Sequence, residues 1–200
     1  MKILIVDDDQ INGEMLAKRL NKRGFETFRV ENGMACIEFI EENEVDLILL
    51  DIMMPDLSGN EVLTTLREFH SPFQLPIIMV TAKHEARDIV TSLKQGANDY
   101  IQKPVNIDVA IARINTQGSL RELYKENLKK TQVETLNAMI VTYNHEINNP
   151  LTVAMGTLQL AMKDATEERM MTIKESLMRI TEIVRKIESV TEGGEIQQED

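Results

Sequence analysis

Short apolar runs alternate with segments of helical periodicity through the first half of the chain, and this alternation constrains the fold most strongly. Runs rich in branched residues predict strands at residues 2–6, 27–30, 46–50, 76–80 and 100–102. Between the earlier runs, apolar residues recur every three or four positions, as on helices that pack against a sheet. Apolar strands separated by helices predict a doubly wound α/β domain with a five-stranded parallel sheet.

Polar residues, most of them acidic, stand where these strands are expected to end. They are Asp7, Asp8, Asp9, Asp51, Thr81 and Lys103, the last followed by Pro104. Ligands of open parallel sheets bind beyond the carboxyl ends of the strands, so these are candidate functional residues. Carboxylates crowded at one edge repel each other unless a cation lies among them, and oxygen ligands favour Mg²⁺ over zinc. The sequence therefore predicts a divalent cation at this edge.

The second half is dominated by helix-forming residues. At residues 136–161, and again at residues 173–190, apolar side chains step by three or four positions, as in a coiled-coil seam. Asp164 and Glu167 have the spacing of a capping box and predict the start of the second helix. A single hairpin of this kind exposes its seam. We therefore expect a homodimer in which two hairpins form a four-helix bundle.

Composition excludes several classes of function. Of the 200 residues 42% are hydrophobic, which suffices for real cores in two small domains. The formal net charge is −11 and both halves are acidic, so neither nucleic acid nor an anionic membrane surface is an expected partner. The single cysteine, Cys36, permits no disulfide and is expected to be a buried structural thiol. No long hydrophobic stretch follows Met1, which predicts a cytoplasmic protein.

Residues 1–117 resemble the receiver domain of two-component response regulators. The resemblance rests on the acidic pair Asp7-Asp8, the motif Leu50-Asp51-Ile52-Met53-Met54-Pro55, and the pairs Thr81-Ala82, Gly96-Ala97 and Lys103-Pro104. It implies a flavodoxin-like fold. Asp51 is implied as the nucleophile that takes a phosphoryl group to form an acyl phosphate. Asp8, Asp51 and the backbone carbonyl of Met53 are implied as Mg²⁺ ligands, with Asp7 acting through water.

The remaining receiver positions also acquire roles from the resemblance. Lys103 is implied to pair with Asp51 before transfer and with a phosphate oxygen afterwards, and Thr81 to donate its hydroxyl to another phosphate oxygen. The Lys103-Pro104 peptide is often cis in this family. Tyr100 occupies the aromatic switch position, so phosphorylation is expected to repack the face of the fourth helix, fifth strand and fifth helix.

Met53 and Lys83 lie two residues after Asp51 and Thr81, where they flank the path of an attacking water in receivers. An apolar side chain at the first of these positions is expected to hinder hydrolysis. The sequence thus predicts a long-lived acyl phosphate that is suited to onward transfer.

The motif Tyr143-Asn144-His145-Glu146-Ile147-Asn148-Asn149-Pro150-Leu151 lies in the first helix of the hairpin. With Tyr143 in the seam, His145 falls on the solvent side, and Pro150 is expected to kink the helix. The motif is similar to the H-box of the dimerisation and histidine-phosphotransfer (HisKA) domain of sensor histidine kinases, over residues 127–191. This similarity implies His145 as phosphoryl acceptor, Glu146 as acid/base residue and Asn149 as the residue that positions water for a phosphatase reaction.

These expectations divide the chain into a receiver domain at 1–118, a dimerisation and histidine-phosphotransfer hairpin at 119–191 and a tail at 192–200. The sequence is compatible with a last receiver helix that runs through Gly118 as one rod or bends there. Histidine kinases follow the hairpin with an ATP-binding domain, which the residues after 191 are too few to form. We therefore expect no intrinsic ATP-dependent kinase activity.

The predicted function is a phosphorelay in which Asp51 and His145 exchange phosphoryl groups with a sensor histidine kinase, a downstream response regulator, or each other. Two alternatives are compatible with the same residues. In one, the chain is a receiver-controlled dimeric regulator or scaffold whose His145 is inactive or serves a partner kinase. In the other, it is a piece of a hybrid histidine kinase that lacks its ATP-binding domain.

Overall fold

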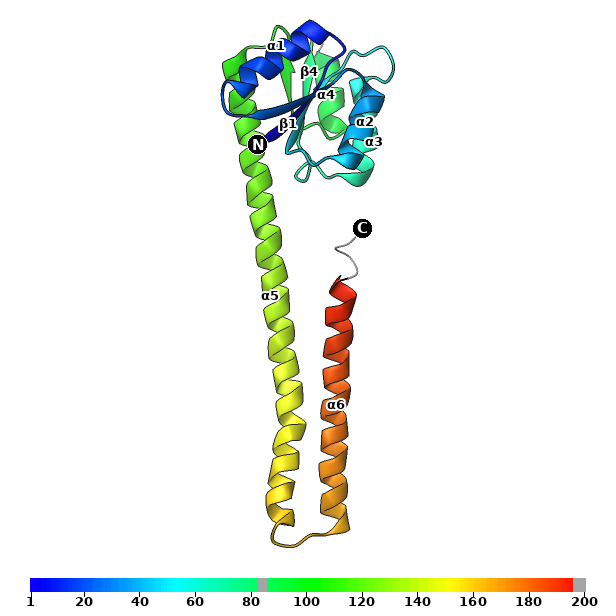
Figure 1. Cartoon of the computed structure of the whole chain (residues 1–200), viewed down its shortest axis with the longest axis vertical. Coiled ribbons are helices and arrows are strands. Elements are labelled where there is room, and N and C mark those ends of the chain that lie inside the picture. Colours follow the sequence, from blue (N-terminus) through cyan, green and yellow to red (C-terminus); the bar gives the residue numbers. More distant parts are fainter. Residues whose placement is uncertain (83–85, 196–200) are drawn as a thin grey trace. The chain divides into compact units, whose positions relative to one another are not determined.

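A computed structural model describes residues 1–82 and 86–195 of the chain. Lys83, one of the two positions linked above to slow hydrolysis, lies outside the described residues. The chain forms two compact units, which meet in the sequence between Leu128 and Lys129. Their helices and strands are labelled in Figure 1.

The first unit is built on five parallel strands in the order β2-β1-β3-β4-β5. These are β1 Lys2–Val6, β2 Glu26–Val30, β3 Leu47–Asp51, β4 Ile77–Thr81 and β5 Asp99–Gln102. The helices between them are α1 Gln10–Asn21, α2 Gly33–Glu42, α3 Gly59–Phe69 and α4 Ala86–Lys94, and α5 begins at Ile107. The predicted doubly wound α/β fold with a five-stranded parallel sheet is confirmed.

Two apolar layers cover the sheet. On one face, side chains of β1, β3 and β4 pack with α2 and α3, and on the other they pack with α1 and the start of α5. Cys36 of α2 is fully buried in the first layer, and burial raises the pKa of its thiol to about 12. The thiol therefore serves as a packing group, as the sequence predicted.

Strands β3 and β4 each end one residue later than predicted. Asp51 is paired with Val80, and Thr81 with Gln102, so the ladder includes the polar residues that were expected to follow it. Asp51 and Thr81 are therefore both held in place by pairing with a neighbouring strand. This limits the backbone freedom of the two positions where chemistry is expected.

The helices of the second half form the predicted hairpin. Helix α5 runs over Ile107–Ala161 and passes through Gly118 without interruption, and α6 runs over Glu167–Glu195. The predicted capping box at Asp164 is wrong, because the Thr166 hydroxyl accepts the hydrogen bond from the Arg169 amide at 3.4 Å and caps α6 instead. Residues 192–195 of the expected tail are helical.

Few side chains of the second unit are buried within a single chain. Pro150, Ala154, Ser176 and Ile183 are the buried ones among its described side chains. Most of the large apolar side chains there are exposed: Val133, Leu136, Ile140, Val141, Leu151, Val153, Met155, Leu158, Leu160, Met162, Met170, Met171, Leu177, Met178 and Val184. None of the helices in the described part of the chain is both long and apolar enough to span a membrane.

Candidate functional site

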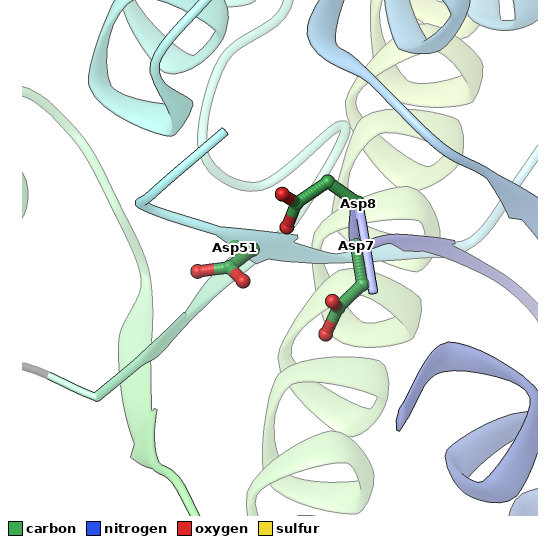
Figure 2. A group of neighbouring side chains, drawn as sticks. All are labelled: Asp7, Asp8 and Asp51. Carbon is green, nitrogen blue, oxygen red and sulfur yellow. The ribbon is translucent and has the colours of Figure 1, made fainter. Parts of the chain in front are cut away.

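The carboxyl ends of four strands bring the predicted residues together. Asp7 and Asp8 directly follow β1, Asp51 ends β3, Thr81 ends β4 and Lys103 directly follows β5. Figure 2 shows the carboxylates of Asp7, Asp8 and Asp51 grouped at this edge of the sheet. The residues come together because parallel strands all have their carboxyl ends at the same edge of the sheet.

The three carboxylates fit a divalent cation. One oxygen from each of Asp7, Asp8 and Asp51 lies within 4.8 Å of the other two. Asp7 and Asp51 are buried, whereas Asp8 is exposed. Receivers typically hold Mg²⁺ in such an acidic cluster, and three carboxylate oxygens are the hard ligands that this ion prefers.

Lys103 joins two of these carboxylates. Its Nζ donates to Asp51 Oδ2 at 2.5 Å, which is the expected pair, and to Asp7 Oδ2 at 2.7 Å, which was not predicted. Burial disfavours the charged ammonium, but the hydrogen bonds and charges of Asp51 and Asp7 outweigh it and raise the pKa of Lys103. The Lys103 amide donates to the Thr81 carbonyl at 2.8 Å, and the Lys103-Pro104 peptide is cis, as the resemblance implied.

The loop after β3 packs tightly around Asp51. The Met53 amide donates to Asp51 Oδ1 at 3.1 Å, and a Cβ on Gly59 would lie 2.1 Å from the Asp51 carbonyl oxygen. Position 59 therefore requires glycine for the loop to take this path. Sequence reasoning did not single out Gly59, although its place at the start of a helix was an available signal.

Asp56 in the same loop was also missed. Its carboxylate accepts from the amides of Gly33 and Met34, at 3.3 Å each, at the N-terminus of α2. Backbone hydrogen bonds, the largest from Leu57, lower the pKa of Asp56. Asp56 thus bonds the loop that carries Met53 to the N-terminus of α2. No local pattern in the sequence indicates this role.

Tyr100 lies beside an arginine on the first turns of α5. The guanidinium carbon of Arg113 is 5.3 Å from the centre of the Tyr100 ring, and Arg113 also pairs with Asp99. The half-buried ring is therefore linked directly to α5. Arg113 was not predicted, because an isolated arginine in a helix carries no signal in the sequence.

The second candidate group lies on α5, in the second unit. His145, Glu146 and Asn149 are all exposed, while Tyr143 is half-buried. The predicted solvent-facing position of the imidazole is confirmed. Since residues four apart share a helix face, Asn149 lies one turn from His145 on the same side.

Family models match two segments of the chain. The response regulator receiver domain matches residues 3–115. The chain belongs to this family. The receiver is followed by a match to the His Kinase A (phospho-acceptor) domain over residues 135–193. Neither match is an ATP-binding domain, and the two together place the chain in two-component signalling.

Individual relatives agree with the receiver assignment. The regulatory protein VanRc of Enterococcus gallinarum is 35% identical over 133 residues, which are 66% of this chain and 56% of that relative. The chain thus covers little more than half the length of VanRc.

Solved receivers superpose on the first unit. A CheY-like receiver domain protein from Methanospirillum hungatei is 32% identical, with a TM-score of 0.58, and covers 62% of this chain and 97% of its own. The receiver domain of a signal transduction histidine kinase from Syntrophus aciditrophicus is also 32% identical, with a TM-score of 0.55, over 59% of this chain and 89% of its own. The fold of the first unit is therefore that of a receiver.

Proposed function

We propose that the chain is a phosphorelay protein in which Asp51 of the receiver and His145 of the HisKA domain each accept a phosphoryl group and pass it to a partner. The observation that carries this proposal is the grouping of Asp51 with two further carboxylates and Lys103 at the sheet edge. An exposed imidazole within an H-box on the same chain supplies the second acceptor. The partners are histidine kinases or response regulators.

Transfer into the receiver begins with the Asp51 carboxylate. One oxygen attacks the phosphorus of a phosphohistidine, the O–P bond forms as the P–N bond breaks, and the departing imidazole keeps the electron pair and takes up a proton. Lys103 Nζ then exchanges its bond with Asp51 for one with a phosphate oxygen, and the Thr81 hydroxyl donates to another. Asp8, Asp51 and the Met53 carbonyl would hold Mg²⁺, with Asp7 acting through water, and the ion would supply charge neutralisation for the phosphoryl oxygens.

Transfer at the hairpin uses the exposed imidazole. A His145 nitrogen attacks the phosphorus of an aspartyl phosphate, the N–P bond forms as the O–P bond breaks, and Glu146 takes the imidazole proton. Asn149, on the same helix face, would orient a water for hydrolysis of the aspartyl phosphate. Because both phosphoryl linkages are high-energy, the direction of flow follows the partners.

The hairpin is proposed to act as a dimer. Its exposed apolar side chains form a surface that an aqueous monomer would not maintain, and a second hairpin of the same sequence would cover it in a four-helix bundle. HisKA domains typically dimerise. The same apolar surface favours the second candidate function, a receiver-controlled scaffold that docks a partner without chemistry at His145.

Labelling separates these functions. The chain would be incubated with Mg²⁺ and acetyl phosphate, or with a phosphorylated partner, and the label tested for lability in wild type, Asp51→Ala and His145→Gln. A base-labile label that Asp51→Ala abolishes, together with an acid-labile label that His145→Gln abolishes, is the expected result. Wild type that carries no phosphoryl group on Asp51 contradicts the receiver chemistry. Output that survives His145→Gln supports the scaffold instead.

A further inference from the structure

The segment of α5 between the two matched families is partly built into the receiver. Neither family model covers residues 116–134, yet the compact unit that contains the receiver continues to Leu128. One side of α5 faces the receiver with buried or half-buried residues that step by four and three positions: Ala110, Ile114, Gln117, Arg121 and Tyr124. The packed side of α5 therefore continues for about two turns beyond residue 115.

Arg121 holds this extension in place. Its side chain is 11% exposed, its Nη1 donates to Asp46 Oδ1 at 2.6 Å, and its Nε donates to the Gln74 carbonyl at 2.9 Å. A third bond, from Nη2, reaches the Val45 carbonyl at 3.4 Å. Asp46 itself accepts from the Lys2 amide at 2.7 Å. This set of contacts, called here the Arg121 clamp, ties α5 to the segments that lead into β1, β3 and β4.

An aromatic stack lies one turn further along the helix. The rings of Phe73 and Tyr124 are 5.5 Å apart at an interplanar angle of 18°. Phe73 belongs to the same connection between α3 and β4 that supplies Gln74. Gly118 is close to the chain start, since a Cβ there would lie 2.9 Å from the Met1 sulfur. Within residues 116–128, α5 is thus packed on the receiver at Gly118, Arg121 and Tyr124.

The same side of α5 is bonded to the start of β5. Gln117 Oε1 accepts from Asn98 Nδ2 at 3.3 Å, and Asn98 Oδ1 accepts from the Ile77 amide at 2.9 Å. One turn earlier, Arg113 contacts Asp99 and the Tyr100 ring. A displacement of β5 would therefore act on α5 immediately before the Arg121 clamp.

We propose that residues 116–128 are a coupling element in which the Arg121 clamp and the Phe73–Tyr124 stack make α5 a rigid part of the receiver. Changes at β5 are thereby delivered to the helix that carries His145. Delivery of a phosphorylation signal rests on the function proposed above, whereas the rigid attachment of residues 116–128 does not.

Amide hydrogen exchange of the full chain tests the attachment. Arg121→Gln removes the charge and the fork of donors, and it should raise exchange in peptides of residues 118–128 on the order of tenfold while β1 and β3 keep their protection. Lys129→Gln, at an exposed cation further along α5, is the matched control and should change nothing there. Unchanged exchange at 118–128 in Arg121→Gln overturns the proposal.

If Arg121→Gln raises hydrogen exchange throughout the receiver, a second variant, Tyr124→Ala, tests the attachment instead. It removes the stack without exposing a buried charge, so exchange should rise within 118–128 alone. If Tyr124→Ala leaves that segment unchanged, the proposal is wrong.

Beryllofluoride with Mg²⁺ tests delivery of the signal. In wild type, peptides around Asp51 and those of residues 118–128 should both change, and in Arg121→Gln the change should stop before residue 118. A response at Asp51 without one at 118–128 refutes delivery and leaves the receiver chemistry intact. No response at Asp51 refutes the proposed receiver function, while the Arg121→Gln comparison still decides the attachment.

Discussion

In the receiver, every apolar side chain of β1, β3 and β4 is buried, whereas most apolar side chains of the described hairpin beyond Leu128 lie in solvent. The two regions also place their reactive groups differently, since Asp51 is buried among charges and His145 is exposed on a helix. The receiver is therefore a complete folding unit with a preorganised site. The hairpin leaves most of its large apolar side chains uncovered in the single chain, and its candidate His145 lies on an exposed helix face.

The largest effect is expected on the proposed dimer of the hairpin. Leu158→Glu places a charge in the predicted seam and should weaken dimerisation by about 4 kcal/mol, roughly a thousandfold. Val153→Glu is the matched control, because Val153 and Leu158 are 50% and 51% exposed, but only Leu158 lies in the predicted seam. That seam consists of Leu136, Ile140, Tyr143, Ile147, Leu151, Ala154, Leu158 and Ala161. Light scattering over a dilution series would measure both. If both variants dissociated equally, the predicted seam would not be the dimer interface.

A somewhat smaller effect is expected in the receiver core. Leu49→Ala truncates a fully buried side chain of β3 and should lower the free energy of unfolding by about 3 kcal/mol. When unfolding of the receiver is followed during denaturation, the loss of free energy should be the same at all protein concentrations. The denaturation midpoint of the hairpin should instead rise with protein concentration. If the denaturation midpoint of the receiver also depended on protein concentration, the receiver would not be a complete folding unit and the two regions would not differ in this respect.

The chemistry of the receiver should respond more modestly to Met53, which is 57% exposed. Met53→Asn replaces an apolar side chain beside the Asp51 site with one that can orient water, and it should speed acyl phosphate hydrolysis roughly tenfold, about 1.4 kcal/mol of barrier. Met34→Asn, at a position 53% exposed on α2, is the control. Phosphate release after removal of the donor would measure both. A wild-type half-life of seconds argues against slow hydrolysis.

The smallest expected effect concerns acid and the Arg121 clamp. Burial opposes ionisation of Asp46, but the Lys2 amide and the charge of Arg121 outweigh it and lower its pKa below the usual 3.8. A folded-state pKa below the unfolded one stabilises the protein above the unfolded value, and this contribution is lost as the pH falls through the folded value. Since Asp46 is partly exposed, the contribution should be about 0.5 kcal/mol.

The unfolding free energy of Asp46→Asn, measured between pH 2 and pH 7, tests whether the contribution of Asp46 is lost on acidification. The variant should be slightly less stable than wild type at pH 7, and the difference should shrink as the pH falls below 3.8, the usual pKa of an aspartate. A difference that grows on acidification would mean that Asp46 is stabilised in its protonated form.

The strands and the residues at their ends could be predicted because apolar runs and the polar residues after them are local patterns. The hairpin followed from helical periodicity in the same way. The second partner of Lys103, the contact of Asp56 with α2 and the Arg121 clamp could not be predicted, since each joins residues distant in the sequence. The cap of α6 was misplaced because Asp164 and Thr166 are both competent acceptors, and the path of the loop selects between them.

The ammonium that bridges Asp7 and Asp51 also sets the charge balance of the sheet edge. Three carboxylates and one ammonium leave two negative charges, so a doubly charged ion makes the edge electroneutral and a singly charged one does not. An arriving anion then meets no excess of its own sign. Under the proposed function, binding of the metal and acceptance of the phosphoryl group would therefore depend on the same balance of charge.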